Sequence, residues 1–314
     1  MRFNAVIFIT ILFFIGLCSF LLYRPNIKNN FSKKKVVCTT GMIASVVHEI
    51  AGDLLDIVCL MGPGVDPHVY KTKPTDVLHI QEAHLLLYNG LHLEGKMVEL
   101  FEELHKTKKV CAVSSWCDNT LLIKVSEQAY DPHIWHDILL WQQIVVPLAK
   151  ELCLIDPEHT AYFIAQAEKY TLKLTTLHNQ IKDSFATIPA QKRVLVTAHD
   201  AFNYFGRAYG FEVVALQGVS TDVQPGLADM VTLVDLIIAK NISVIFVESC
   251  IPKKSIEAVV QMAQRRGHTL QMGKELLADA LGDQEKNADT YVGMMYYNMR
   301  TIMDGYALHG MPAI

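Results

Sequence analysis

The sequence lacks several motifs that would place it in a common class of enzyme or metalloprotein. Its seven cysteines form no C-x-x-C or C-x-x-C-H motif, which argues against a thiolate zinc cluster, a thioredoxin-type site and a c-type haem. The H-E-x-x-H motif of zinc peptidases is also missing. A formal net charge of −4 provides no basic surface for nucleic acid, so nucleic acid is not expected as a partner.

One apolar run stands out, and it lies at the N-terminus. Arg2 is followed by apolar residues 5–23 and then by the polar, lysine-rich residues 24–35, an order typical of an export signal. No clear small-x-small cleavage site follows the run. Cys18 would suit lipid modification, but Leu17 stands where a small residue should precede it. We favour a cleaved signal, with a lipid anchor or an uncleaved membrane anchor as alternatives, and each places the rest of the chain outside the cytoplasm.

A long helix is predicted near the middle of the chain, from Pro157 to about Ala186. Asp156 and Pro157 suit a helix start, and the pair Ile188-Pro189 suits its end. Such a helix would be about 45 Å long, enough to link two lobes. The apolar residues that define its buried face by their helical spacing are Phe163, Ile164, Ala167, Tyr170, Leu174, Leu177, Ile181 and Phe185.

Alternating strands and helices are predicted on both sides of this helix. In the first half we expect strands over 35–40, 55–61, 84–88 and 109–114, and helices over 42–51, 74–83, 94–104 and 138–154. In the second half we expect strands over 193–198, 212–217, 243–249 and 269–272, and helices over 200–209, 227–240, 255–266 and 290–309. The predicted fold class is α/β, with two lobes that each hold a mainly parallel four-stranded sheet flanked by helices.

The predicted domain organisation follows from these elements. Residues 1–33 form the signal or anchor and a linker, 34–155 the N-terminal lobe, 156–189 the linking helix and 190–314 the C-terminal lobe. Cys111 and Cys117 are near enough in sequence to form a disulfide in an oxidising compartment, and their state stays open at this point.

The clearest chemical signal is a near-repeat in the first half. Asp66-Pro-His68-Val-Tyr70 is echoed by Asp131-Pro-His133-Ile-Trp135. Proline stiffens each loop, and the aspartate in each is placed to accept a hydrogen bond from an imidazole ring. Both loops are expected where strands of the first sheet end, the edge at which open α/β sheets bind ligands.

Two further candidates occupy matching positions in the second half. His199 ends a predicted strand, with Asp200 available to cap the helix that follows, and Asp279 lies beyond the last strand. Three imidazoles and one carboxylate suit a divalent transition metal such as zinc, iron or manganese. Calcium or magnesium would require mostly oxygen ligands.

With these motifs in place, the chain resembles the metal-binding solute-binding proteins of ABC importers for zinc, manganese and related ions. The resemblance covers nearly the whole chain after the signal and rests on seven segments in the family's order: 64–70, 88–94, 131–135, 196–205, 218–225, 245–249 and 277–282. It implies two α/β lobes joined by a rigid helix, with one zinc, manganese or iron(II) ion between them as the transported ligand. It also implies that His68, His133, His199 and Asp279 bind that ion. The partners implied are an ABC permease and its ATPase in the inner membrane, and no enzyme activity is implied.

Some residues depart from the family pattern. His136 follows the second motif where leucine is usual, and we interpret it as a surface histidine, with an accessory ligand as the alternative. His84 replaces a common aspartate and is interpreted as structural, and Glu248 as a hydrogen-bonding scaffold rather than a ligand. The absence of a histidine-rich loop argues against a dedicated zinc importer. Manganese-binding members of the family often carry glutamate at the position of His199, so the histidine there argues for zinc. The metal stays undecided among the three.

Two other functions compete with metal capture. A zinc-dependent hydrolase would need an open coordination position and a general base, for which Glu248 or Asp200 would have to serve. A surface adhesin on the same scaffold is the third possibility. A closed four-ligand site favours binding over catalysis, and a rigid linking helix predicts release by small shifts rather than by a large hinge motion.

Overall fold

A computed structural model describes residues 33–307, so the predicted export signal lies outside the described residues. The first half contains strands β1 (Lys35–Thr40), β2 (Asp56–Met61), β3 (Leu85–Tyr88) and β4 (Val110–Ala112) and helices α2 (Gly41–Ala51), α3 (Pro74–Glu82), α4 (Val98–Leu104), α5 (Ile138–Gln142) and α6 (Val145–Ile155). Helix α7 (Thr160–Ala186) follows. The second half contains strands β5 (Val194–His199), β6 (Glu212–Gln217), β7 (Val244–Glu248) and β8 (Gln271–Leu276) and helices α8 (Asn203–Tyr209), α9 (Leu227–Ala239), α10 (Lys254–Arg265) and α11 (Tyr291–Ala307).

The first half is built on one parallel sheet, as predicted. Its strand order is β2-β1-β3-β4, and neighbouring strands in this order are parallel. Apolar side chains bury both faces, because Val36 and Cys38 face one core while Val37 faces another. Parallel strands of this kind are buried on both sides and therefore read as continuous apolar runs in the sequence.

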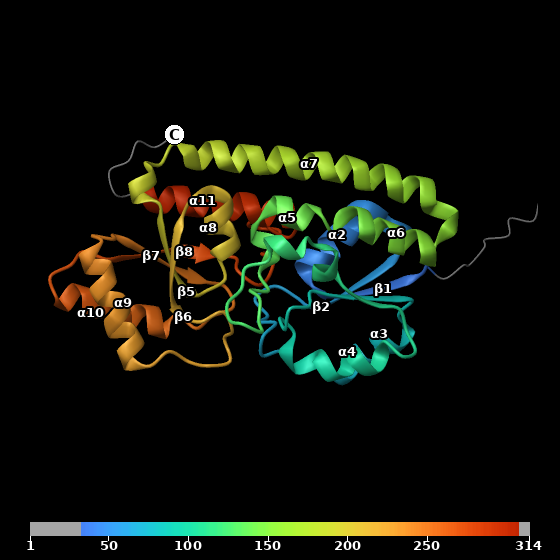
Figure 1. Ribbon diagram of the computed structural model, residues 1–314, viewed down its shortest axis with the longest axis horizontal. Helices are drawn as coiled ribbons and strands as arrows, with labels where there is room; N and C mark the ends of the chain where they lie inside the picture. The colour runs from blue at the N-terminus through green and yellow to red at the C-terminus, as the bar shows by residue number, and fades with distance from the viewer. Residues whose placement is uncertain (1–32, 308–314) are drawn as a thin grey trace, which may run out of the picture. The chain divides into compact units, whose positions relative to one another are not determined.

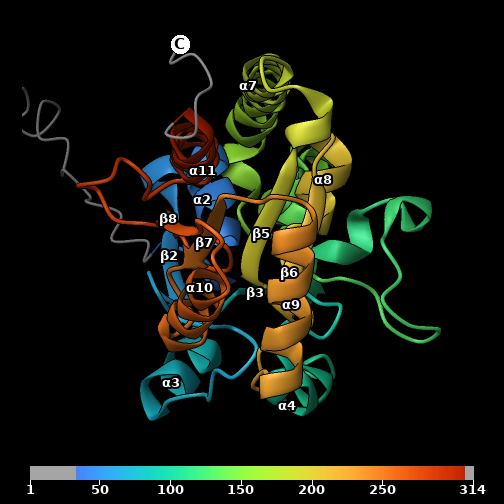
Figure 2. The same cartoon turned by 90° about the vertical axis from the view of Figure 1, so that its left-hand side faces the viewer.

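The second half differs from the expected four-stranded sheet. Its strands form two parallel pairs, β5-β6 and β7-β8, although β5 and β7 lie next to each other. Figure 2 shows β5 and β6 beside α9, and β7 and β8 above α10. The backbone amides of Ala198 and His199, at the end of β5, donate to the side chain of Glu248, and the carbonyl of Val194 accepts from the hydroxyl of Tyr306. Backbone groups at both ends of β5 are therefore hydrogen-bonded to side chains and not to a neighbouring strand.

Helix α7 spans both halves and covers their helices (Figure 1). It contacts α2, α5 and α6 before it and α8 and α11 after it. With 27 residues it is about 40 Å long. All the predicted core positions along it are buried except Ile164, which is 48% exposed. The helix begins at Thr160, after a 3-10 turn over Pro157–His159, and Asp156 does not cap it.

The helix expected over 138–154 is broken in two. Helix α5 ends at Gln142, and α6 starts at Val145. Pro147 explains the break, since it has no amide to bond the carbonyl of Gln143 and its ring would clash with that carbonyl.

A single large core connects the two halves. It contains Val46 of α2, Trp141 of α5, Leu174 of α7, Phe205 of α8 and Met294 of α11. Buried contacts cross the boundaries expected near residues 155 and 190. The division into two lobes and a linking helix therefore stays a prediction.

Candidate metal centre

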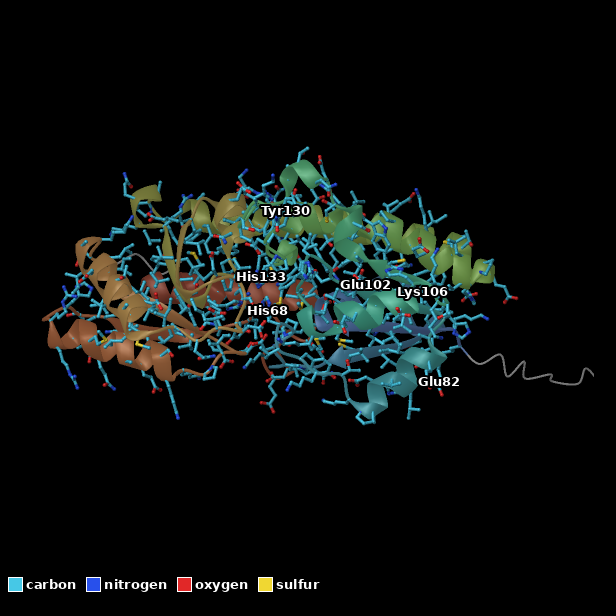
Figure 3. The ribbon with its side chains drawn as sticks, turned by 60° about the horizontal axis from the view of Figure 1, so that its bottom comes forward. His68, Glu82, Glu102, Lys106, Tyr130 and His133 are labelled. Carbon is cyan, nitrogen blue, oxygen red and sulfur yellow. The ribbon has the colours of Figure 1, made fainter. Side chains whose placement is uncertain are left out.

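The four candidate ligands come from four separate segments that meet where strands end. His68 lies in the loop between β2 and α3, and His133 directly precedes the 3-10 turn Ile134–His136. His199 is the last residue of β5, and Asp279 follows β8. Figure 3 shows His68 and His133 close together at the middle of the molecule. The carboxyl ends of parallel strands form the usual ligand-binding edge of an α/β sheet, and two candidates come from each half.

The ligand atoms of these side chains are close enough to share one ion. All lie within 4.8 Å of one another. His68 Nε2 is 3.2 Å from His133 Nε2 and 3.7 Å from Asp279 Oδ2. Asp279 Oδ1 is 3.4 Å from His133 Nε2, and Asp279 Oδ2 is 3.2 Å from His199 Nε2. Ligands about 2.0–2.1 Å from a tetrahedral ion are separated by roughly 3.4 Å, so the spacing fits a first-row divalent metal.

Burial makes this cluster unusual. The four residues are at most 3% exposed, and neither oxygen of Asp279 nor Nε2 of His199 has a hydrogen-bond partner in the described part of the chain. Buried polar atoms are normally hydrogen-bonded, so several unsatisfied atoms facing one point fit a cation-binding site. A cation would satisfy all of them at once.

Two of the three imidazoles are oriented by carboxylates. Nδ1 of His133 bonds Oδ1 of Asp131 at 2.7 Å, and Nδ1 of His199 bonds Oε2 of Glu248. A carboxylate on Nδ1 keeps the proton on that nitrogen and leaves the Nε2 lone pair free for a metal ion. The scaffold role predicted for Glu248 and the orienting role predicted for Asp131 are confirmed in the structure.

His68 is held differently from the other two. Asp66 was expected to orient its ring, but Asp66 Oδ1 accepts from the backbone amide of His68 at 2.9 Å instead. The other oxygen, Oδ2, accepts from the hydroxyl of Thr221 at 2.7 Å. The prediction for Asp66 was wrong. Asp131 accepts in the same way from the backbone amide of His133 at 3.0 Å and also bonds the His133 ring, whereas the remaining oxygen of Asp66 is bonded to Thr221.

The pKa values of these side chains favour cation binding, because they keep His68 neutral and Asp279 negatively charged. Burial lowers the pKa of His68 to about 4, against the opposing effect of the Asp279 charge. Burial alone would raise the pKa of Asp279, but His199 and His133 outweigh it and hold that pKa well below its usual range. Burial opposes protonation of His199, whereas Glu248 and Asp279 raise its pKa well above its usual range. A protonated His199 carries a second proton on Nε2, which faces Asp279, and a metal ion would displace that proton while the Nδ1 proton stays on the bond to Glu248.

Two expectations about nearby residues were wrong. His136 is fully buried rather than on the surface, and its ring packs on Phe202 with centroids 4.4 Å apart. Asp200 does not cap a helix, because α8 begins only at Asn203 and Phe202 occupies the cap position. His84 is structural as predicted, since its Nδ1 accepts from the amide of Lys35 at 3.1 Å.

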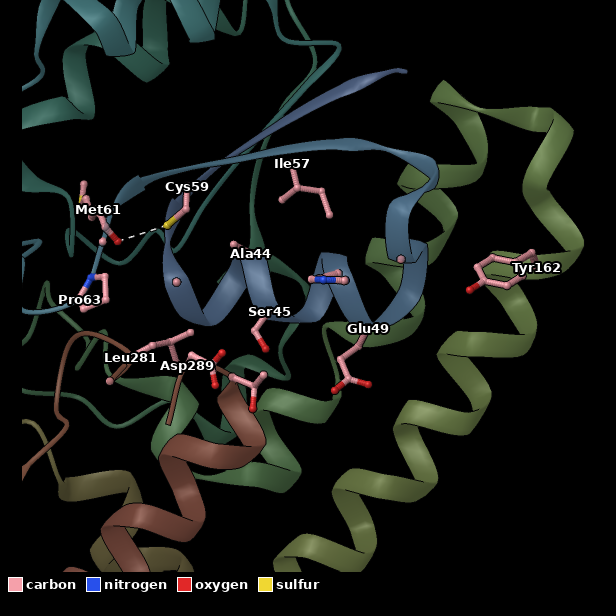
Figure 4. Close-up of a pocket in the computed structure, with 16 residues that line it drawn as sticks. Ala44, Ser45, Glu49, Ile57, Cys59, Met61, Pro63, Tyr162, Leu281 and Asp289 are labelled. Carbon is pink, nitrogen blue, oxygen red and sulfur yellow. Dashed lines mark hydrogen bonds between the residues drawn. The ribbon is translucent and has the colours of Figure 1, made fainter. Parts of the chain in front are cut away.

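The described cysteines do not contribute to the centre. All six in residues 33–307 are free thiols, including Cys111 and Cys117. A cavity of about 640 Å³ lies elsewhere, between α2, strand β2 and the segment 281–290. Figure 4 shows Cys59 and Ile57 on one side of this cavity and Leu281 and Asp289 on the other. None of the four candidate ligands lines it.

Comparisons with known proteins agree with this geometry. Residues 36–305 match the family described as zinc-uptake complex component A, periplasmic. The chain is 44% identical over 275 residues to the zinc-binding protein TroA of Treponema pallidum (strain Nichols), covering 88% of this chain and 89% of that protein. It is 42% identical over 269 residues to the manganese-binding lipoprotein MntA of Bacillus subtilis (strain 168), covering 85% of this chain and 88% of that protein.

A solved structure extends the likeness to the fold. The periplasmic zinc-binding protein TroA from Treponema pallidum matches with a TM-score of 0.85 at 43% identity, covering 87% of this chain and 99% of that chain. The family match includes both halves and the helix between them. The chain belongs to the family of periplasmic zinc-uptake complex A components.

Proposed function

We propose that this protein is the extracytoplasmic solute-binding component of an ABC importer. It captures one divalent transition metal ion with His68, His133, His199 and Asp279 and delivers the ion to a membrane permease. The observation that carries this proposal is the convergence of four buried ligand groups, with both oxygens of Asp279 left without a hydrogen-bond partner among residues 33–307.

The ligand set supports binding rather than catalysis. Four protein ligands that enclose an ion leave no position for a reactive water, and this is the pattern of non-catalytic metal sites. The family consists of metal-uptake components, and its match to residues 36–305 sets aside the zinc-dependent hydrolase. Glu248, the base that a hydrolase would have used, already bonds His199 and two backbone amides.

The metal is zinc, manganese or iron(II). Imidazole suits zinc and iron, and the carboxylate extends the range toward manganese. The relatives fit this range, because TroA is named for zinc and MntA for manganese. The ion is the cargo of the protein, so its affinity has to allow both capture and release.

The partners and location follow from this role. We expect the protein in the periplasm, exported by the N-terminal signal or held by a lipid or membrane anchor. The permease with its ATPase lies in the inner membrane and would contact exposed surfaces of both halves beside the metal site. Gene deletion distinguishes this role from that of an adhesin on the same scaffold. Deleting the importer component should abolish metal uptake, whereas deleting an adhesin would leave metal uptake intact.

Elemental analysis tests the proposal directly. The exported protein is stripped of metal, loaded separately with zinc, manganese and iron(II) under anaerobic conditions, and then challenged with a chelator. We expect about one ion per chain, and the order of retention ranks the three metals. The double variant His68→Ala plus His199→Ala should bind none, because half of the ligands are gone.

A matched histidine serves as the control. His105 is exposed at the end of α4, so His105→Ala should bind metal as the wild type does. A wild type that binds no metal would refute the proposed function. Equal binding by the wild type and the double variant would show that the ion lies somewhere else.

A further inference from the structure

A metal ion bound in this centre could leave only after some of the protein around it moves. Each of the four side chains is at most 3% exposed; His68, His133 and Asp279 lie in loops, and His199 ends strand β5. A large hinge motion is opposed by the core that runs through both halves and by the contacts of α7 with each of them. The moving part is therefore a loop, and the hydrogen bonds of each loop indicate which one.

The loop that carries His133 is fixed firmly to the second half. The hydroxyl of Tyr204 donates to the carbonyl of Asp131 at 2.9 Å, and Asn203 Nδ2 donates to the Asp131 carboxylate at 3.1 Å. The indole of Trp135 donates to the carbonyl of Ala278, next to Asp279, at 2.8 Å. These bonds are buried or partly buried, so His133, His199 and Asp279 form one rigid framework, although His133 precedes α7 in the chain.

The loop that carries His68 has fewer such bonds, and one of them is weak. It is anchored in the first half by Tyr70, whose hydroxyl bonds the carbonyl of Leu60 and the carboxylate of Asp76. Among residues 33–307, its hydrogen bonds to the second half are one from Thr221 Oγ1 to Asp66 at 2.7 Å and a weak one from the thiol of Cys250 to the carbonyl of Val65 at 3.7 Å. Lys96 and Asp222 add a half-exposed ion pair beside this loop, which is worth little in water.

Asp66 connects Thr221 to His68 directly. One carboxylate oxygen accepts from Thr221, and the other accepts from the backbone amide of His68 at 2.9 Å. Thr221 is only 4% exposed, so water does not readily replace its hydroxyl. No carboxylate bonds the ring of His68 in residues 33–307, in contrast to the rings of His133 and His199. The position of His68 therefore depends on the bond between Thr221 and Asp66.

From these contacts we infer that Thr221 is a positioning residue that holds the His68 loop closed over the metal. Breaking its hydrogen bond to Asp66 releases His68 from the framework and opens the route by which the ion leaves. This inference rests on the proposed function, since it concerns release of the captured ion. It assigns to the segment 218–226, between β6 and α9, control of the residence time of the metal.

The test compares metal release from the wild-type exported protein and from variants at Thr221 and Ser220. Zinc-loaded protein is mixed rapidly with an excess of a chromophoric chelator, and the rate of zinc transfer is measured. Thr221→Val removes the hydroxyl at nearly constant size and should speed release about 10- to 100-fold, the effect of losing a hydrogen bond to a carboxylate. Thr221→Ser retains the hydroxyl and should release zinc at the wild-type rate.

A neighbouring hydroxyl provides the matched control. Ser220 lies in the same segment, but its hydroxyl bonds only Asp222 among the described residues, so Ser220→Ala should release zinc at the wild-type rate. The thermal midpoint of each metal-free protein is measured as well. Thr221→Ala repeats the test with a side chain that cannot clash, in case valine prevents folding.

The outcomes separate this inference from the proposed function. A wild type that binds one zinc and a Thr221→Val variant that releases it at the same rate would overturn the role of Thr221 alone. Equal acceleration by Ser220→Ala would also overturn it, because the effect would then belong to the whole segment. Faster release with an unchanged metal-free midpoint, restored by serine, supports it.

Discussion

His136 should destabilise the protein, and replacing it by leucine should make the protein more stable. The side chain is fully buried, and neither ring nitrogen has a hydrogen-bond partner in residues 33–307. Leucine is close in size, needs no partner and is the residue that the family pattern places there. The substitution therefore removes two unsatisfied polar atoms without leaving a large cavity.

The magnitude follows from two opposing contributions. An unsatisfied buried donor or acceptor costs about 1–3 kcal/mol. The packing of His136 on Phe202 is worth about 0.5–1.5 kcal/mol beyond burial, and leucine loses it. We expect His136→Leu to raise the free energy of unfolding by about 2 kcal/mol at pH 7.5.

The gain should grow as the pH falls. Burial lowers the pKa of His136 to about 3, whereas the unfolded chain has an ordinary histidine pKa of about 6.5. Below pH 6.5 the unfolded state binds more protons than the folded state, so the wild type loses stability as the pH falls toward 3. At pH 5 this histidine alone costs a further roughly 2 kcal/mol. His68 acts in the same direction in both proteins and cancels in the comparison.

Urea unfolding of the metal-free proteins, followed by circular dichroism at pH 7.5 and pH 5, measures the effect. The difference between His136→Leu and the wild type should about double between the two pH values. A variant that is no more stable, or that loses stability with pH as steeply as the wild type, would refute the reasoning. Loss of metal binding in this variant would instead make His136 an accessory ligand.

Three further predictions concern Glu248 beside the metal ligands, the bound metal and the linking helix. Glu248→Gln should weaken metal binding by about 10- to 100-fold in calorimetric titration, since it disturbs the imidazole that Glu248 orients, while Glu212→Gln on the surface should have no effect. Zinc at about 100 times its Kd should stabilise the wild type by about 2.7 kcal/mol in urea unfolding, and a similar gain in the double histidine variant would contradict the site. Leu174→Ala, at a fully buried position of α7, should lower the free energy of unfolding by about 3–4 kcal/mol. Leu172→Ala, at a 70% exposed position, should change it by no more than about 0.5 kcal/mol, and equal losses would contradict the predicted buried face.

The sequence was sufficient to bring the four candidate ligands together. His68 and His133 lie in a near-repeat, His199 ends a predicted strand and Asp279 follows another, and the ends of parallel strands meet at one edge of a sheet by a general rule. That rule applies within one sheet, so the expectation that both halves share one metal ion came from the resemblance to the importer family. The structure places the side chains of His68, His133, His199 and Asp279 within 4.8 Å, but their role as metal ligands is still to be tested.

Features set by long-range packing could not be predicted. His136 looks like a polar loop residue, and only Phe202, far along the chain, shows that it is buried. The hydrogen bond from Thr221 to Asp66 joins two loops that no sequence pattern relates. The bonds from the backbone amides of Ala198 and His199 to the Glu248 side chain likewise join residues about 50 positions apart, and the division of the second sheet into two pairs has no signal in the sequence. The break between α5 and α6 is different, because Pro147 signals it in the sequence.

The shared core has a consequence for how the protein unfolds and how it can be re-engineered. Helices α2, α5, α7, α8 and α11 all bury side chains in the same cluster, so removal of either half exposes apolar surface of the other. We therefore expect the two halves to melt in one cooperative transition, with equal calorimetric and van't Hoff enthalpies in scanning calorimetry. A chimera that exchanges halves with a relative would have to preserve this cluster across the junction, whatever metal the ligands prefer.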